Sequence, residues 1–136
     1  MLVFAVLFAN AQVVKNFTTV VGGGTTTVTV TNTGTGTLDV FLPGKKQSIT
    51  VNVTVTKTSG VVAGAITLLG SFDGTIWKAV NGLESVTALP TNTATDVAVN
   101  TYHWRLHYSP FPYYRVSHTG VGTMVSVMSA QVLSRQ

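Results

Sequence analysis

The chain has 136 residues, no cysteine, and eight basic against four acidic residues, which gives a net charge of +4. The lack of thiols excludes disulfides, thiolate zinc sites and cysteine catalysis, and the bases are too scattered to mark a groove that binds nucleic acid. Charged residues make up only 9% of the chain, and 23 threonines supply much of its polarity. A polar surface with few charges is poorly protected against association, so we expect a homo-oligomer or a subunit of a larger assembly.

The N-terminal segment opens with a run of seven apolar residues, 2–8, followed by Ala9-Asn10-Ala11. This Ala-Asn-Ala sequence imitates a signal-peptidase site, but the positive charge that usually precedes the apolar run is missing. The run is also too short to span a bilayer. We therefore predict a retained apolar arm or strand over residues 1–21 and a β-sandwich domain over residues 22–136. A cleaved secretion signal is the alternative.

A two-residue alternation of apolar and polar side chains is the main structural signal. Ile49, Val51, Val53 and Val55 alternate with polar residues in segment 47–57, which is typical of a half-buried β-strand. In chain order, the predicted strands cover residues 25–31, 38–42, 47–57, 61–72, 76–80, 84–89, 97–99, 102–108, 113–119 and 123–133. No segment keeps a period of 3.6 residues long enough to predict a helix.

Turn signals separate these strands. They are Gly22-Gly23-Gly24, Asn32-Thr33-Gly34-Thr35-Gly36, Pro43-Gly44, Ser59-Gly60, Asp73-Gly74, Asn81-Gly82, the polar loop 90–96, Ser109-Pro110-Phe111-Pro112 and Gly120-Val121-Gly122. Segment 61–72 is almost continuously apolar, which predicts a central strand buried on both faces. About eight to ten short strands at regular spacing predict an all-β fold, a single antiparallel β-sandwich of jelly-roll or immunoglobulin-like type.

The residues give no support to catalysis or to a metal site. His103 and His107 share one strand face, but four residues at about 3.3 Å each place them roughly 13 Å apart, too far for one zinc ion. The four acids are dispersed along the chain, and no Gly-x-Ser-x-Gly motif is present. We therefore expect no enzymatic activity, no catalytic residues, no cofactor and no small-molecule substrate.

Aromatic residues are concentrated in segment 102–114. Rings that alternate along paired strands favour a role in the core or at a subunit interface. A glycan-binding platform is the alternative, because exposed aromatic rings can stack on sugars. Its candidate residues are Trp77, Tyr102 and Trp104.

Three local motifs point to a family. They are Gly70-Ser71-Phe72-Asp73-Gly74-Thr75-Ile76-Trp77, then Tyr113-Tyr114-Arg115-Val116 followed by Thr119-Gly120-Val121-Gly122-Thr123, and a threonine-rich opening strand with Asn32-Thr33-Gly34-Thr35-Gly36-Thr37. Together they span residues 25–133 and resemble small β-sandwich virion proteins of tailed bacteriophages. The GS-x-DG-x-x-W motif also occurs in carbohydrate-binding sandwiches.

The resemblance implies a structural protein of the virion. It implies above all a capsid decoration (auxiliary) subunit that docks on the major capsid protein, other virion proteins and neighbouring copies, at the capsid surface rather than the tail. The predicted assembly interface consists of the N-terminal arm and one loop residue, namely Leu2, Val3, Phe4, Val6, Leu7 and Phe111. A carbohydrate-binding module, on a tail tip or secreted, and a tail or neck subunit are the alternative functions.

Overall fold

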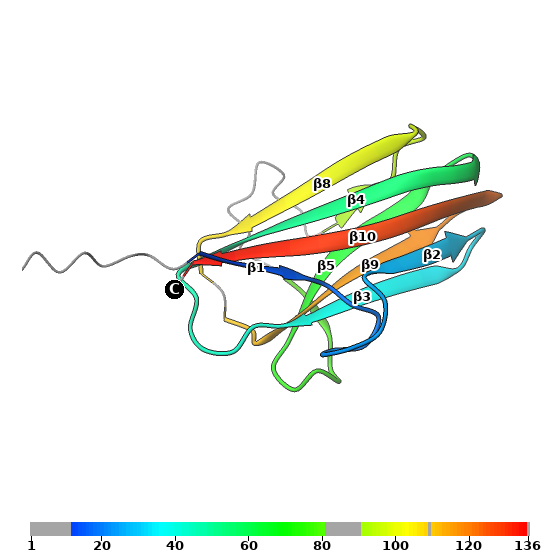
Figure 1. Ribbon diagram of the computed structural model, residues 1–136. Coiled ribbons are helices and arrows are strands. Elements are labelled where there is room, and N and C mark those ends of the chain that lie inside the picture. The colour runs from blue at the N-terminus through cyan, green and yellow to red at the C-terminus, as the bar shows by residue number, and fades with distance from the viewer. Residues whose placement is uncertain (1–11, 81–90, 109, 136) are drawn as a thin grey trace, which may run out of the picture.

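The computed structural model describes residues 12–80, 91–108 and 110–135, and every regular element in these residues is a β-strand (Figure 1). The strands are β1 (Gln12–Asn16), β2 (Thr27–Thr31), β3 (Thr35–Phe41), β4 (Ser48–Gly60), β5 (Gly64–Ser71), β6 (Lys78–Ala79), β7 (Thr91–Thr93), β8 (Val99–Leu106), β9 (Tyr113–Gly120) and β10 (Met124–Arg135). They confirm the predicted all-β fold. The predicted strand 84–89 and the Asn81-Gly82 turn lie outside the described residues.

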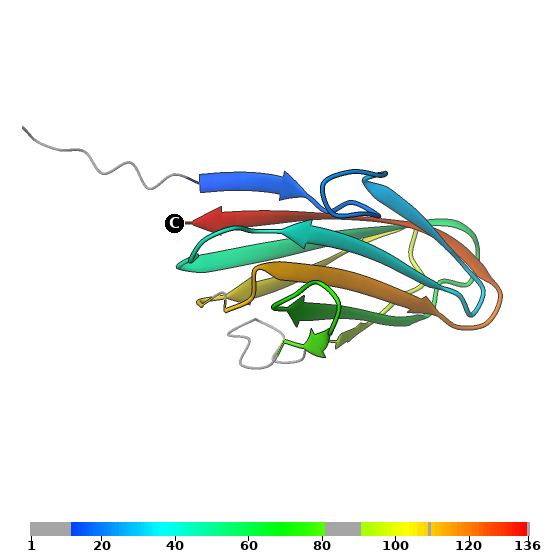
Figure 2. The same ribbon diagram turned by 90° about the horizontal axis from the view of Figure 1, so that it is seen from below.

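The strands form two antiparallel sheets that pack face to face. Sheet A has the order β1-β10-β4-β8, and β2 also pairs with β10. Sheet B has the order β3-β9-β5-β6, and β7 also pairs with β5. Figure 2 shows the two layers from below, with β1 and β10 in one layer and β9 and β5 in the other. This is the predicted antiparallel sandwich.

The core lies between the sheets, and the alternation seen in the sequence builds it. Ile49, Val51, Val53 and Val55 of β4 are all buried, while the polar residues between them face outward. A valine or isoleucine withdrawn from water in this way contributes roughly 1.5–3 kcal/mol. The largest fully buried side chain is Trp104 of β8.

The segment after residue 11 belongs to the sandwich. β1 pairs with the far end of β10, and Phe17 is fully buried in the core. All five residues of β1 are exposed, so backbone pairing and the Phe17 anchor hold this strand. Residues 1–11, which contain the arm part of the predicted interface (Leu2, Val3, Phe4, Val6 and Leu7), lie outside the described residues.

Two predicted segments differ from the structure. β5 alternates instead of being buried on both faces: Ile66 and Leu68 are fully buried, whereas Thr67 and Leu69 are half-buried. Among the described residues, no further strand layer covers the outward face of sheet B, and these side chains keep partial contact with water. In the predicted loop 90–96, the described part contains β7, which pairs with β5.

The turn between β2 and β3 lies where the sequence predicts it, but it is not a hairpin. It joins the two sheets, because β2 pairs with β10 in sheet A and β3 pairs with β9 in sheet B. Asn32 has φ of 51°, in the left-handed region that asparagine tolerates better than most residues. The Gly34 amide donates to the Thr31 carbonyl at 2.8 Å, which closes the turn.

Candidate assembly surface

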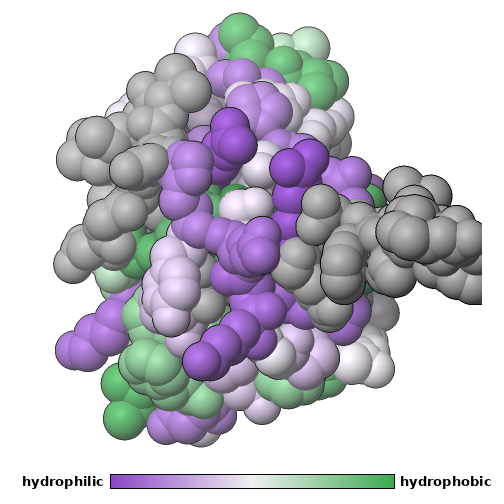
Figure 3. Space-filling model, turned by 90° about the vertical axis from the view of Figure 1, so that its left-hand side faces the viewer, coloured by the Kyte–Doolittle hydropathy of each residue, from purple (hydrophilic) through white to green (hydrophobic). Residues whose placement is uncertain are grey.

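Several connections meet at the end of the sandwich where β1 begins and β10 ends, which we call the terminal end. The Leu42 amide donates to the Pro112 carbonyl at 2.7 Å, and the Gln47 amide donates to the Arg135 carbonyl at 3.0 Å. The first bond joins the β3–β4 connection to the β8–β9 connection, and the second joins the β3–β4 connection to the end of β10. Figure 3 looks onto the terminal end, where hydrophobic side chains gather along the lower edge below a more hydrophilic centre.

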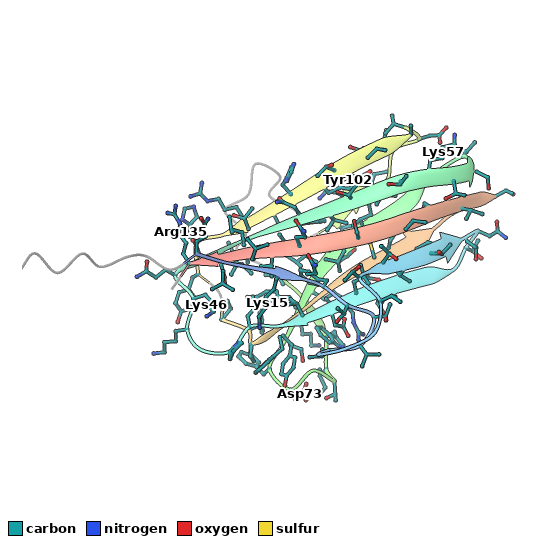
Figure 4. All side chains as sticks on the ribbon, in the orientation of Figure 1. Lys15, Lys46, Lys57, Asp73, Tyr102 and Arg135 are labelled. Carbon is teal, nitrogen blue, oxygen red and sulfur yellow. The ribbon has the colours of Figure 1, made fainter. Side chains whose placement is uncertain are left out.

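The β5–β6 loop forms part of this end, and a network centred on Asp73 fixes its shape. The Asp73 carboxylate accepts hydrogen bonds from the amides of Thr75 and Ile76 at 2.8 and 2.9 Å, and from the Ser71 hydroxyl at 2.9 Å. The Ile76 amide is the largest cause that lowers the pKa of Asp73, followed by Thr75 and Ser71. Figure 4 shows Asp73 at the lower tip of the molecule. The carboxylate therefore holds the loop in one conformation at neutral pH.

Beside this turn lies an apolar groove of about 290 Å³, which we call the Phe72 groove. Its lining consists of Gly70, Ser71, Phe72, Asp73, Ile76, Lys78 and Phe111. The Phe72 and Ile76 side chains are exposed, with fractional exposures of 71% and 66%. The ring centroids of Phe72 and Phe111 lie 4.8 Å apart, so the two rings form one wall.

Phe111 connects the groove to the core. Its ring meets the buried ring of Tyr114 edge-on, with centroids 6.1 Å apart. A Cβ at Gly70 would overlap the Phe111 ring, so only glycine at this position lets the ring lie against β5. Of the predicted interface residues, Phe111 is the one that the structure describes, and it lies at the border between core and groove. Phe72 and Ile76 were not predicted, although two bulky apolar residues on either side of an Asp-Gly turn are a signal for exposed apolar surface.

A charged stack holds the same loop on the outer face of sheet B. Arg115 of β9 makes two hydrogen bonds to the Asp39 carboxylate of β3, of 2.6 and 2.8 Å. The Arg115 guanidinium also lies 4.1 Å from the centroid of the Trp77 ring. The hydrogen bond to Asp39 raises the pKa of Arg115 above its ordinary value. The ion pair and the cation–π contact together fasten the end of the β5–β6 loop to the sheet.

The structure does not form the predicted glycan platform. Trp104 is fully buried and Tyr102 is 9% exposed, because both face inward from β8. Trp77 lies in the β5–β6 loop and stacks on Arg115 of sheet B. The three rings are therefore not brought together, and neither β8 ring offers a face to a sugar.

The acids in the described part of the chain all have structural partners. Asp39 pairs with Arg115, and Asp73 organises its turn. Asp96 accepts from the Lys57 ammonium and from the Val62 amide, each at 2.9 Å, and the bond from Lys57 is the first cause of its lowered pKa. These bonds give each of the three described acids a structural role in the fold.

The histidines are placed apart. His103 is exposed and hydrogen-bonds Asn52 across the strands at 2.6 Å, and His107 is exposed just beyond the end of β8. His118 is fully buried between the sheets, and burial lowers its pKa. Within residues 12–80, 91–108 and 110–135, no three His, Cys, Asp or Glu residues form a group that could hold a metal ion. The same residues contain no helix long and apolar enough to cross a bilayer.

Comparisons with known proteins give structural matches only. No protein-family model matches the chain, and no curated protein matches it. The SPBc2 prophage-derived protein YomS matches with a TM-score of 0.54 and 14% identity, over 96% of this chain and 100% of that one. The enzymatically active domain of bacteriophage CBA120 tailspike protein 4 matches with a TM-score of 0.51 and 7% identity, over 88% of this chain but 19% of that one.

A family 16 carbohydrate-binding module matches over 86% of this chain and 80% of that one, with 10% identity, but its TM-score of 0.42 is too low to bear on function. At such identities the two better matches show the fold alone. The chain is an antiparallel β-sandwich of a kind that also occurs in two phage-derived proteins.

Proposed function

We propose that this protein is a non-enzymatic structural subunit of a bacteriophage virion, and specifically a capsid decoration subunit that docks on the capsid lattice and on neighbouring copies. The observation that carries the proposal is the Phe72 groove. The exposed Phe72 and Ile76 side chains line one apolar groove together with Phe111, and an apolar groove of this kind can serve as a surface that a partner covers.

The rest of the molecule supports the same role. The surface of the sandwich is polar but carries few charges, and the acids of the described residues are taken up by structural bonds. Repeated, symmetric contacts between such subunits can bury a large area without any single strong interaction. The sequence resemblance to virion proteins agrees with this arrangement.

The experiment is to purify particles of the phage that encodes the chain and to measure the copy number by quantitative mass spectrometry, with the major capsid protein as internal standard. Hundreds of copies per particle are the expected result. A few copies per particle would replace the decoration role by a tail or neck role. Absence from particles would overturn the proposal as a whole.

Carbohydrate binding is tested separately through tryptophan fluorescence. Trp104 is fully buried, so only Trp77 can respond to a sugar. The expected result is unchanged emission when glycans of the host surface are added. Saturable quenching that disappears in Trp77→Phe would favour a carbohydrate-binding module over the decoration subunit.

A further inference from the structure

We infer that the Phe72 groove of one copy receives the apolar N-terminal segment, residues 2–8, of a neighbouring copy. The inference deepens the proposed function and rests on it, since it assumes that copies of the chain assemble. It names the partner of the groove as a second copy of this chain and the contact as an arm from one copy in the groove of the next.

The groove has the chemistry of an acceptor for apolar side chains. Phe72, Phe111 and Ile76 supply its rings and its aliphatic surface. Its polar members are Ser71, Asp73 and Lys78, and the hydroxyl of Ser71 and the carboxylate of Asp73 are committed to the turn beside the groove. A polar ligand would therefore find few free partners in the groove, whereas an apolar side chain would remove the exposed phenylalanine and isoleucine from water.

The chain itself supplies a matching segment. Residues 2–8 read Leu-Val-Phe-Ala-Val-Leu-Phe, and no charged residue precedes Lys15. The segment comes before Gln12, where β1 begins at the same terminal end that carries the groove. An extended chain spans at most about 3.3–3.6 Å per residue, so eleven residues can reach roughly 36–40 Å, which is enough to contact a neighbour.

The position of β1 favours a neighbour over the same copy. β1 lies beside β3, at the edge of the sandwich opposite β6 and the groove, as Figure 2 and the order of sheet B show. An arm in the groove of the next copy makes a head-to-tail contact, which closes into a ring or extends along a lattice according to the angle between subunits.

Cysteine cross-linking tests the contact, because the full chain has no cysteine of its own. Two single variants, Phe4→Cys and Ile76→Cys, are purified separately, mixed and treated with a mild oxidant. The control mixture pairs Phe4→Cys with Val61→Cys. Val61 is 61% exposed, similar to Ile76, but it lies beside the β9–β10 turn at the opposite end of the sandwich.

The expected result is a disulfide-linked heterodimer in the Phe4/Ile76 mixture, formed roughly tenfold or more faster than in the control mixture because docking raises the effective concentration. Equal rates in the two mixtures would overturn the inference. A double variant that closes its disulfide within one chain, with no link in the mixture, would show that the arm occupies its own groove and would also overturn it. So would a mature protein that lacks residues 1–11 by mass spectrometry.

The outcomes separate this inference from the proposed function. Hundreds of copies per particle without the cross-link would leave the decoration role standing and remove the arm-in-groove contact. A specific cross-link in a protein that is absent from particles would support the arm-in-groove contact and overturn the decoration role.

Discussion

His118 makes the stability of the fold depend on pH in a range where the acids stay ionised. Its ring is fully buried, and neither ring nitrogen reaches a partner at ordinary hydrogen-bond geometry. Burial is the larger effect and lowers the pKa of His118, while the nearby Ala63 carbonyl opposes part of this shift. The folded protein therefore keeps the imidazole neutral at a pH where the unfolded chain already binds a proton.

The sign follows from the protons bound in each state. With the folded pKa below the unfolded value of about 6.5, the unfolded state gains protons first as the pH falls, so the free energy of unfolding decreases. If the folded imidazole stays neutral, going from pH 7.5 to pH 5.5 costs about 1.4 kcal/mol. Asp73 and Asp96 do not contribute in this range, because their pKa values are lowered in the folded protein and lie near 4 in the unfolded chain.

Urea denaturation of the wild type and of His118→Leu at pH 7.5, 6.5 and 5.5 measures this difference. We expect the wild type to lose stability over the range, by at most about 1.4 kcal/mol from His118, and His118→Leu to lose less. At pH 7.5 the leucine variant should be at least as stable, because it removes two unpaired buried nitrogens. His103→Leu is the matched control, because it removes an exposed imidazole and leaves the buried His118 in place. The same pH dependence in wild type and His118→Leu would refute the reasoning.

Two further predictions concern the groove and the charged stack. Gly70→Ala should lower the free energy of unfolding by about 1–3 kcal/mol, because its methyl group displaces an aromatic ring, whereas Gly23→Ala, with open space at the Cβ position, should change it little. Urea denaturation checks both, and equal effects would show that the ring is free to move. Asp39→Asn should cost about 1–3 kcal/mol, because it breaks a two-bond pair with Arg115, whereas Lys57→Ala, which removes an exposed ion pair with Asp96, should cost less. Thermal unfolding ranks the two variants, and a larger effect at Lys57 would contradict the assignment.

Most of the sandwich could be predicted because alternation records directly which side chains face inward. The pattern of Ile49, Val51, Val53 and Val55 is the clearest case. β7 was missed because Thr91–Thr93 carries no apolar residue: backbone pairing with β5 defines this strand, together with a hydroxyl contact between Thr67 and Thr91 at 2.9 Å.

The candidate surface was harder to predict than the fold. Phe111 could be named from its place in a proline-rich corner, but the groove exists only because β5 and the β8–β9 connection bring Gly70 and Phe72 beside it. Contacts between residues some forty positions apart leave no local pattern. The alternative of a glycan platform fails at Tyr102 and Trp104 for a different reason, and burial agrees with the core role that their alternation favours. Tyr102 and Trp104 share their face with buried Leu106, which places them in the core.

The position of β10 constrains how the chain reaches its native state. This strand pairs with β1, β2 and β4, and the other nine strands of the described structure precede it along the chain. Sheet A therefore cannot assemble until β10 has been synthesised, and until then β4 has β8 alone as a partner in that sheet. Folding that waits for such distant pairing is slow and leaves strand edges open to wrong partners. A truncation within β10 should therefore yield aggregated protein rather than a smaller stable domain.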